Sequence, residues 1–235
     1  MTSVEVNSPP DEQTRMTHPA VYEVCPAISS TISLRHAPPS KNKIKRIFDI
    51  FASAILILFF IPLFLFLSAA IRMDSPGSIL FRQRRSGLLG LPFVIYKFRT
   101  MHAYEDGKNI QQATRGDIRV TRVGAIMRKL SLDELPQLLN VLKGDMSIVG
   151  PRPHALAHDE LWANDVPTYV NRFRVRPGLT GYAQIMGLRG EITDDTQLKA
   201  RVDADNYYVD SWSVNLEVSI LLRTLPMVIK DPRAY

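Results

Sequence analysis

The chain has few of the residues that build disulfide or metal frameworks. Its 235 residues include one cysteine, Cys25, and five histidines. A single cysteine excludes an internal disulfide and a cysteine-rich metal site. His154 and His158 lie four residues apart, but no glutamate follows the first and no third ligand is near in the sequence. The histidine spacing therefore does not predict a metal site.

The common nucleotide and hydrolase motifs are also missing. The sequence contains no P-loop, no Gly-x-Gly-x-x-Gly, no Gly-x-Ser-x-Gly and no His-Glu-x-x-His. What it does contain is an excess of positive charge, +6 overall, which favours an anionic partner such as phosphate, nucleic acid or a lipid surface. The basic residues form no nucleic-acid-binding motif, so we expect no nucleic acid.

The N-terminal third divides into a tail and an apolar segment. Residues 1–40 are rich in Pro, Ser and Thr and lack periodicity, which predicts a disordered tail. A basic cluster leads into 22 uncharged residues, Ile50 to Ile71, long enough to cross a bilayer as a helix. The long preceding stretch argues against a signal peptide.

Two features argue against a simple crossing. Pro62, in the middle of the run, removes a backbone hydrogen bond and kinks a helix. Both flanks are basic, so the positive-inside rule gives no orientation or places both ends in the cytoplasm. A re-entrant helix over 41–72, broken at Pro62, satisfies both observations. A spanning helix remains open on the residues alone, because prolines also occur in spanning helices.

Residues 73–235 have the pattern of a globular domain. Short apolar runs at 78–81 and 93–98 predict strands. Helical periodicity predicts helices near residues 122–130, 133–143, 154–163 and 196–211. Residues 214–229 are apolar with polar interruptions, too polar to span, and fit either an interfacial or a core helix; beside a membrane segment we favour the interface. We therefore expect a mixed, helix-rich α/β membrane-associated catalytic domain.

The segment Ser131 to Asn140 is the main candidate for chemistry. It places Asp133 and Glu134 at the start of an expected helix, with Ser131 and Glu134 in capping-box spacing. A helix N-terminus stabilises anions, so Asp133 should stay ionised, as a nucleophile or metal ligand must. The alternative is that both carboxylates merely cap a surface helix.

Four cations lie in aromatic or proline-glycine settings that suit phosphate binding. Lys97 and Arg99 lie in an aromatic segment, Arg152 lies between two prolines, and Arg176 precedes Pro-Gly. A guanidinium held by rigid backbone can bind phosphate bidentately. Taken singly, each of these cations is more typical of a solvent-exposed or turn residue. Together with the acidic pair and the membrane segment, they favour a site for a diphosphate donor at a lipid surface.

The motifs together resemble the monotopic polyprenyl-phosphate phosphoglycosyltransferases, the bacterial sugar transferase family that starts exopolysaccharide and O-antigen synthesis. The resemblance runs from about residue 44 to the C-terminus. The matching stretches are Lys45-Arg-Ile-Phe-Asp49, Asp74-Ser-Pro-Gly77, Phe81 to Gly87, Lys97-Phe-Arg-Thr-Met101, Ser131 to Asn140, Gly144 to Pro153, Arg176 to Gln184, Asp205 to Val209 and Trp212-Ser213.

The resemblance implies a fold and a reaction. It implies a re-entrant helix and a cytosolic catalytic domain with interfacial helices over 73–235, on the cytoplasmic face of the bacterial inner membrane. It also implies transfer of a sugar-1-phosphate from a UDP-sugar to undecaprenyl phosphate, with release of UMP.

The resemblance further implies roles for individual residues. Asp133 would be the nucleophile that forms an aspartyl-phosphosugar intermediate, and Glu134 would hold Mg²⁺. The implied substrate-binding residues are Lys97, Arg99, Arg152, Arg176 and Asp205, with Arg176 and Asp205 the weaker candidates. A homo-oligomer is compatible with this pattern.

Some positions depart from the family pattern. Met186 stands where a small polar residue is common, and Tyr182 where Trp is common. The stretch Gly187 to Glu191 resembles members that transfer hexose-1-phosphates, which favours UDP-glucose or UDP-galactose. Two other functions stay open: a non-catalytic membrane-anchored basic module that binds anionic lipid or a synthesis partner, and a membrane-bound phosphohydrolase that uses Asp133.

Overall fold

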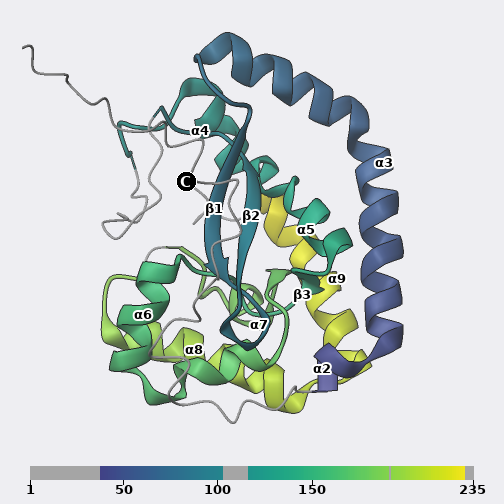
Figure 1. The fold of residues 1–235 in the computed structure, drawn as a ribbon, viewed down its shortest axis with the longest axis vertical. Coiled ribbons are helices and arrows are strands. Elements are labelled where there is room, and N and C mark those ends of the chain that lie inside the picture. The colour runs from purple at the N-terminus through teal and green to yellow at the C-terminus, as the bar shows by residue number, and fades with distance from the viewer. Residues whose placement is uncertain (1–37, 103–115, 191, 231–235) are drawn as a thin grey trace, which may run out of the picture.

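The computed structural model describes residues 38–102, 116–190 and 192–230. A single long helix, α3 (Lys43–Asp74), lies along one side of a helical body that carries a long β-hairpin (Figure 1). The short helix α2 (Pro38–Lys41) precedes α3. Except for its last three residues, the predicted disordered tail over 1–40 lies outside the described residues.

The hairpin and a small parallel pair of strands are the sheets of the described residues. Strands β1 (Leu80–Ser86) and β2 (Pro92–Phe98) are antiparallel, in a register that pairs Leu80 with Phe98, and the 3₁₀ turn η2 (Leu88–Gly90) lies between them. Strands β3 (Ser147–Val149) and β4 (Gly178–Thr180) pair in parallel. The strand expected at 93–98 is confirmed, whereas the one expected at 78–81 begins later and extends through a polar stretch.

The remaining elements are helical. They are α4 (Arg122–Lys129), η3 (Leu132–Glu134), α5 (Gln137–Lys143), α6 (Leu156–Asp165), η4 (Pro167–Arg174), α7 (Tyr182–Ile185), α8 (Asp195–Ser211) and α9 (Val214–Lys230). Four expected helices are confirmed as α4, α6, α8 and α9. The helix expected at 133–143 is instead divided into η3 and α5. The mixed, helix-rich character predicted from the sequence is also confirmed.

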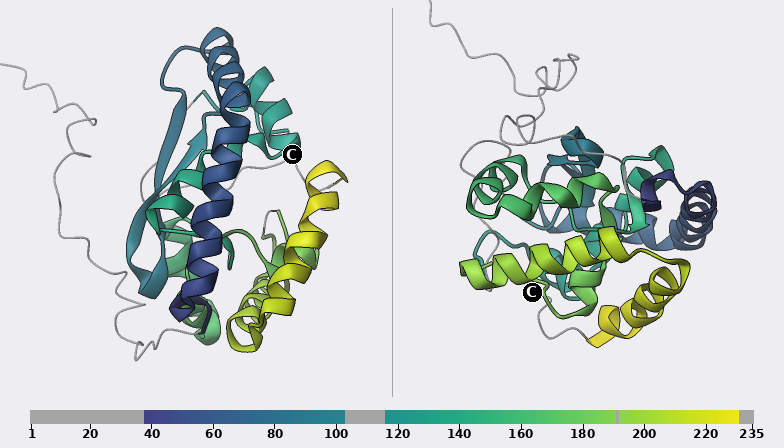
Figure 2. Two further views of the ribbon diagram at one scale, coloured as in Figure 1. Left: turned by 90° about the vertical axis from the view of Figure 1, so that its right-hand side faces the viewer. Right: turned by 90° about the horizontal axis from the view of Figure 1, so that it is seen from below.

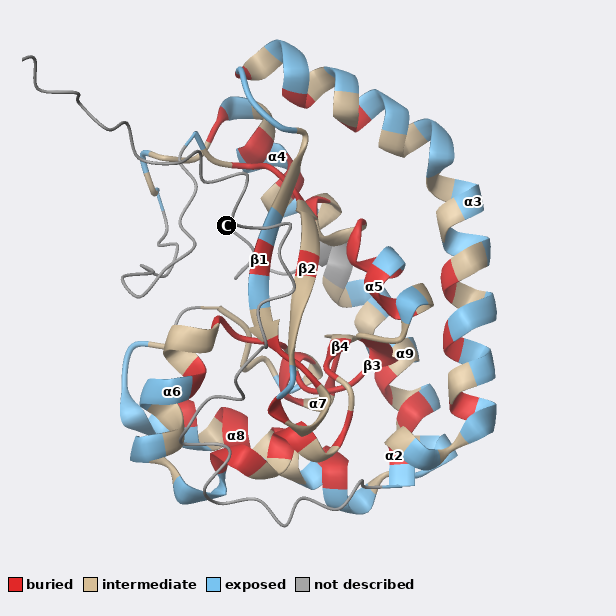
Figure 3. Ribbon diagram, in the orientation of Figure 1, coloured by how far each residue is buried: buried red, intermediate tan, exposed pale blue. Residues whose placement is uncertain are grey.

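Helix α3 is the one helix among the described residues that is long and apolar enough to cross a membrane, and only 11% of its most apolar window is buried. Figure 3 shows exposed residues along its outer side. Large apolar side chains such as Phe51, Phe59 and Phe66 are exposed there. Ser53 and Ser68 donate to the carbonyls of Asp49 and Phe64, which satisfies their hydroxyls within the helix. A water-soluble surface rarely exposes this much apolar area, so this side of α3 suits lipid.

Pro62 does not interrupt α3, which differs from the predicted break. The helix is continuous from Lys43 to Asp74 with Pro62 inside it, and it curves over toward α4 in its second half (Figure 1). A proline inside a helix removes one backbone hydrogen bond and crowds the preceding turn, which accounts for a bend without a gap.

Both ends of α3 are fastened to the same body. Near its start, Asp49 accepts hydrogen bonds from the Ser147 hydroxyl (2.8 Å) and the Ile148 amide (3.1 Å) of β3. At its end, the Asp74 carboxylate accepts the Val123 amide in the first turn of α4 (3.1 Å). The apolar helix therefore starts and finishes in polar contact with one globular domain.

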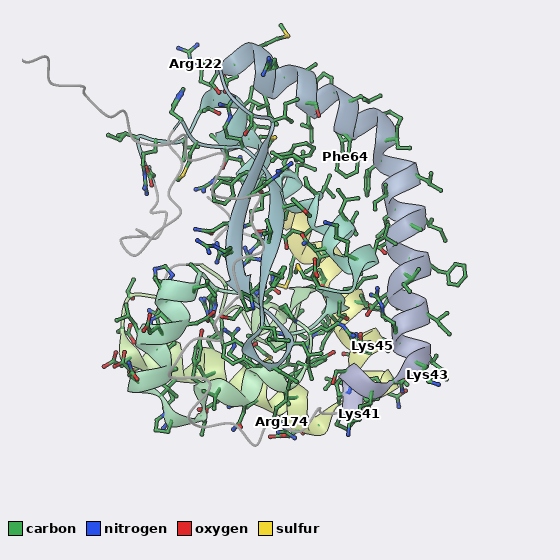
Figure 4. The ribbon with its side chains drawn as sticks, viewed as in Figure 1. Lys41, Lys43, Lys45, Phe64, Arg122 and Arg174 are labelled. Carbon is green, nitrogen blue, oxygen red and sulfur yellow. The ribbon has the colours of Figure 1, made fainter. Side chains whose placement is uncertain are left out.

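A buried ion pair joins α3 to α9. The Lys45 ammonium contacts Glu217, and the side chains are only 7% and 9% exposed. Glu217 also accepts hydrogen bonds from the Tyr208 hydroxyl (2.9 Å) and the Trp212 indole (2.7 Å). Figure 2 shows α9 on the same side of the molecule as the first half of α3, and Figure 4 shows Lys45 pointing inward from α3.

Helix α9 has two apolar faces, so it fits both the core helix and the interfacial helix that its sequence allows. Ile220 is fully buried in the main core with Tyr208 and Val209. Val214, Val218, Leu222 and Leu225 are exposed at helical spacing on another face. The helix thus belongs to the core and also presents apolar side chains outward.

We predict that Lys45→Met destabilises the fold by about 3–5 kcal/mol, because it leaves the Glu217 carboxylate buried without its cation. Lys43→Met is the matched control. Lys43 lies two residues before Lys45 and is exposed, so this substitution should change stability by at most about 0.5 kcal/mol. Urea unfolding in detergent measures both. The double variant Lys45→Met/Glu217→Gln should recover much of the loss, and equal stabilities of the two lysine variants would contradict the prediction.

Candidate functional site

The acidic pair lies in a short 3₁₀ turn rather than in the first turn of a long helix. Ser131, before η3, has a left-handed backbone (φ 54°) and makes no side-chain cap, so the expected capping box is wrong. Its hydroxyl instead accepts a hydrogen bond from Arg189 (2.8 Å). Pro136, which lacks an amide hydrogen, separates this turn from α5. The division presents Asp133 and Glu134 on a tight turn.

Glu134 is held by two cations from distant parts of the chain. The Arg152 guanidinium grips it bidentately, with Nη1 donating to Oε2 at 2.9 Å and Nη2 to Oε1. Lys97 on β2 donates to Oε1 at 3.0 Å. Burial favours the neutral acid, but Arg152 and Lys97 outweigh it and hold the pKa of Glu134 well below its ordinary value. Glu134 is therefore a firmly ionised carboxylate.

Asp133 behaves in the opposite way. Asp133 is 8% exposed. Burial and the neighbouring charge of Glu134 raise the pKa of Asp133, whereas Lys97, Arg128 and Arg152 oppose the rise. This raised pKa differs from the expectation based on a helix N-terminus, because the short turn leaves burial as the main influence. Adjacent carboxylates whose pKa values are pushed apart are typical of catalytic sites.

Cations outnumber carboxylates around this turn. Lys97, Arg128 and Arg152 act on Asp133, and Arg189 adds to the field at Glu134. They come from β2, α4, the segment after β3 and the segment after α7. Burial lowers the pKa of Lys97, while Glu134 opposes that effect. The site has an excess of positive charge from four segments, which suits a phosphorylated ligand.

A buried network of side chains holds the backbone of Arg152 in place. Arg172 on η4 donates to the Arg152 carbonyl oxygen (2.6 Å) and to Asp205 Oδ2 on α8 (2.8 Å). It also donates to the Tyr169 hydroxyl (2.9 Å). Burial and the charge of Arg172 keep the pKa of His154, which also contacts Arg172 at 2.6 Å, well below its ordinary value. The network fixes the backbone that carries the phosphate-binding candidate.

The other predicted site residues are dispersed. Asp205 lines a pocket with Arg152, but its carboxylate pairs with Arg172, and burial raises its pKa against the effect of that cation. Arg99 differs from the prediction: it is 4% exposed and its guanidinium donates to the carbonyls of Ser75 (2.6 Å) and Pro76 after α3. These contacts stabilise the turn after α3, not the acidic pair.

Arg176 is also away from the pair. It donates to the Gly144 carbonyl (2.9 Å) and the Ser40 carbonyl (3.3 Å), where the chain enters α3. The sequence did not single out Arg172, Arg128 or Arg189. Arg172 and Arg128 occur among many basic residues without a distinguishing local pattern, and the Gly187 to Glu191 stretch gave no sign that its Arg189 lies near the acidic pair.

The donor set suits a magnesium ion that arrives with phosphate oxygens. Among the described residues no group of three or more His, Cys, Asp or Glu side chains gathers as a ready-made metal site. Mg²⁺ commonly takes one or two carboxylates together with substrate phosphates and waters. Asp133 and Glu134 supply two carboxylates, and the surrounding cations could transfer their contacts from Glu134 to an incoming diphosphate.

A buried Asp133 beside a partly buried Glu134, surrounded by cations on a domain with an exposed apolar helix, defines a site for phosphorylated substrates beside a membrane. Comparison with known proteins supports the same class of site. The chain belongs to the bacterial sugar transferase family, whose model matches residues 40–231. The resemblance drawn from the sequence motifs is thereby confirmed, and the chain is placed among undecaprenyl-phosphate sugar phosphotransferases by several similar proteins.

Three relatives illustrate the range of the family. The chain is 52% identical to a Caulobacter vibrioides protein named UDP-glucose:undecaprenyl-phosphate glucose-1-phosphate transferase, over 81% of this chain and 72% of that protein. An Escherichia coli protein of the same name is 44% identical, over 82% of this chain and 41% of its own length. An Aeromonas hydrophila protein named UDP-N-acetylgalactosamine-undecaprenyl-phosphate N-acetylgalactosaminephosphotransferase is 42% identical, over 79% and 44%. The chain spans about two fifths of the last two proteins.

We predict opposite stability effects for neutralising the two carboxylates. The raised folded-state pKa of Asp133 means that its charge destabilises the fold above its unfolded-state pKa, so Asp133→Asn should raise the melting temperature by a few degrees at pH 7.5. The depressed pKa of Glu134 means that its charge stabilises the fold above its ordinary pKa, so Glu134→Gln should lower the melting temperature there.

The pH dependence and a control make this test specific. As the pH falls through the depressed pKa of Glu134, the wild type loses this contribution, so the gap between wild type and Glu134→Gln should close. Asp203→Asn, at an exposed position on α8, should leave the melting temperature nearly unchanged. A lower melting temperature for Asp133→Asn than for Glu134→Gln would contradict the assigned electrostatics.

Proposed function

We propose that this chain transfers a hexose-1-phosphate from a UDP-sugar to undecaprenyl phosphate and releases UMP, as the first membrane step of exopolysaccharide or other glycoconjugate synthesis. The observation that carries the proposal is the buried Asp133 beside Glu134, with Lys97 and Arg152 gripping the glutamate. A carboxylate in that setting can attack phosphorus, while the cations neutralise charge on the leaving nucleotide.

The reaction proceeds in two displacements at one phosphorus atom. An oxygen of ionised Asp133 attacks the β-phosphorus of the UDP-sugar, and the bond to the bridging oxygen breaks so that UMP leaves with the electron pair. A phosphate oxygen of undecaprenyl phosphate then attacks the same phosphorus, and Asp133 leaves as a carboxylate. The products are UMP and undecaprenyl diphosphate-linked sugar. Covalent catalysis lets a water-soluble donor and a lipid acceptor react in turn.

The electrostatics fit these steps. Asp133 must lose its proton to attack, and Lys97, Arg128 and Arg152 favour the ionised form against the effect of burial. Lys97 and Arg152 are the phosphate ligands, and they would exchange Glu134 for the donor's diphosphate. Glu134 would hold Mg²⁺, which supplies additional neutralisation of the diphosphate when bound. Arg172 positions Arg152 through its carbonyl.

The donor is a hexose nucleotide in this proposal. Four of the similar proteins are named for glucose-1-phosphate and one for N-acetylgalactosamine phosphate, so family membership leaves the sugar open. The Gly187 to Glu191 stretch favours UDP-glucose or UDP-galactose. These two donors, with UDP-N-acetylgalactosamine, form the first panel for assay.

We predict exchange of labelled UMP into the UDP-sugar without any lipid acceptor, because a phosphosugar-enzyme intermediate makes the first step reversible. Asp133→Asn should reduce exchange and transfer by at least about a thousandfold while the protein stays folded, and Asp203→Asn should retain both. Removal of Mg²⁺ with EDTA should suppress exchange.

Other results would assign other functions. Full exchange by Asp133→Asn would reject Asp133 as the nucleophile. UMP release without lipid and without exchange would indicate a hydrolase. No release from any donor, together with binding to anionic vesicles, would indicate the non-catalytic anchor.

The proposed location is the cytoplasmic face of the inner membrane, with α3 as a re-entrant helix and α9 at the interface. A straight helix of this length would extend about 48 Å, more than the roughly 30 Å hydrocarbon core. Yet Asp49 and Asp74, near its two ends, bond to β3 and α4 of one domain. One polar domain cannot lie on both sides of a bilayer, which supports re-entry.

We predict that cysteines at both ends of α3 are accessible from the cytoplasm only. Lys41→Cys and Pro76→Cys, each made in a Cys25→Ser background, occupy exposed positions just before and just after the helix. A membrane-impermeant thiol reagent should label both in inverted vesicles and neither in intact spheroplasts. Labelling of one position from each side would establish a spanning helix and reject re-entry.

A further inference from the structure

Arg85 on β1 is a partly buried cation that contacts the turn carrying Arg152. Its Nη1 donates to the Pro153 carbonyl (3.3 Å), and its Nη2 donates to the side chain of Gln83, which is only 3% exposed. The backbone of Arg85 also forms a β-bridge with Ala155, two residues after Pro153. The β-hairpin therefore holds the segment just after Arg152 through both a side chain and the backbone.

The Pro-Arg-Pro turn is fixed at two successive carbonyl oxygens. Arg172 donates to the carbonyl of Arg152 (2.6 Å), and Arg85 donates to the carbonyl of Pro153 (3.3 Å). Arg172 comes from η4 and Arg85 from β1, so the two contacts come from separate parts of the fold. Two such contacts restrict the orientation of the turn more than one can, because a turn held at a single point can still rotate about it.

The hairpin also carries Lys97, the other cation that contacts Glu134. Side chains alternate between the two faces of a strand, and directly paired residues share a face. Arg85 therefore shares a face with Phe81, which pairs with Lys97 on β2. Phe81 and Arg85 are four residues apart on β1, a separation of about 13 Å along the strand. The hairpin thus places Lys97 directly and Arg152 through Arg85, at a fixed spacing.

Arg85 and Arg152 are held close together although their charges repel. Burial and the charge of Arg152 lower the pKa of Arg85 to about 10, whereas Asp159 and Glu134 oppose that effect. Arg85 in turn contributes to the lowered pKa of Lys97. Holding cations together costs free energy, which a bound anion such as a diphosphate offsets. Perturbed pKa values of this kind are common at functional sites.

We propose that Arg85 is a positioning residue for Arg152: it holds the Pro-Arg-Pro turn so that Arg152 and Lys97 can bind the same diphosphate. The inference rests on the proposed transferase function and adds to it a residue that acts without touching the substrate. A guanidinium whose backbone is already fixed loses less freedom when it binds phosphate, so Arg85 strengthens diphosphate binding through Arg152.

A double-mutant cycle tests this coupling. The affinity for UDP is measured by calorimetry in detergent for wild type, Arg85→Gln, Arg152→Gln and the double variant. Arg85→Gln alone should weaken UDP binding about tenfold, as expected when a charge-assisted contact to phosphate is impaired. In the Arg152→Gln background it should weaken binding by no more than about twofold, because the residue through which it acts is gone.

Arg84→Gln is the matched control for this cycle. Arg84 is the next residue along β1, is exposed and points to the other face of the hairpin. This variant should bind UDP as the wild type does. Melting temperatures are recorded for every variant, and a lower melting temperature of Arg85→Gln with wild-type affinity for UDP would leave a purely structural contact and reject the proposal.

A second variant separates position from charge. Arg85→Lys keeps the positive charge but has one ammonium in place of the two guanidinium nitrogens that donate to Gln83 and Pro153. It should therefore bind UDP nearly as weakly as Arg85→Gln does, and it replaces that variant in the cycle if Arg85→Gln does not fold. Wild-type affinity in Arg85→Lys would overturn the proposal, because charge alone would then suffice. Equal losses from Arg85→Gln in both backgrounds would also overturn it, and would make Arg85 an independent phosphate ligand.

UDP binding and turnover together separate this proposal from the transferase itself. If the wild type binds UDP but releases no UMP from any donor, the transferase fails, while the cycle still decides the role of Arg85. If the wild type does not bind UDP, the diphosphate site and the role of Arg85 fail together. In an active enzyme, the kcat/KM for UMP release from the preferred donor should fall about tenfold in Arg85→Gln and stay at the wild-type value in Arg84→Gln.

Discussion

The ion pairs of Glu134 with Arg152 and Lys97 are the interaction on which the site depends. They join three segments, η3, β2 and the Pro-Arg-Pro turn after β3, that are far apart in the sequence. The same cations limit the cost of burying Asp133 beside another carboxylate, because they oppose the rise in its pKa that burial and the charge of Glu134 cause. Without them, a buried Asp133 would favour its protonated form and lose its value as a nucleophile.

The apolar helix α3 also contacts the elements that carry the acidic pair. Arg46, in its first turn, donates to the Val141 (2.6 Å) and Leu142 (2.9 Å) carbonyls at the end of α5, and Asp74, at its end, accepts an amide at the start of α4. Helices α4 and α5 are the elements on either side of the acidic pair. The membrane segment thus caps both neighbours of the site, which links the placement of the site to the membrane surface.

The sequence predicted the features that depend on local pattern. Periodicity found α8 and α9, and the apolar run found α3. The sequence did not predict features that depend on distant partners. Arg99 and Arg176 resembled phosphate ligands, but each donates to backbone carbonyls. Arg172 carries no local signal, although four buried groups meet at its guanidinium. The short turn at Asp133 was missed because Ser131 adopts a left-handed backbone, which a serine seldom does and a capping box does not predict.

The cations around the acidic pair suit only one part of a nucleotide sugar. Charge-assisted contacts at Lys97 and Arg152 suit the diphosphate, which every nucleotide sugar shares, and so they cannot select the sugar. Selection requires groups that pair with some hydroxyl patterns and stay unpaired with others. The cations around Glu134 therefore account for recognition of the diphosphate, and the choice of sugar needs neutral polar groups as well.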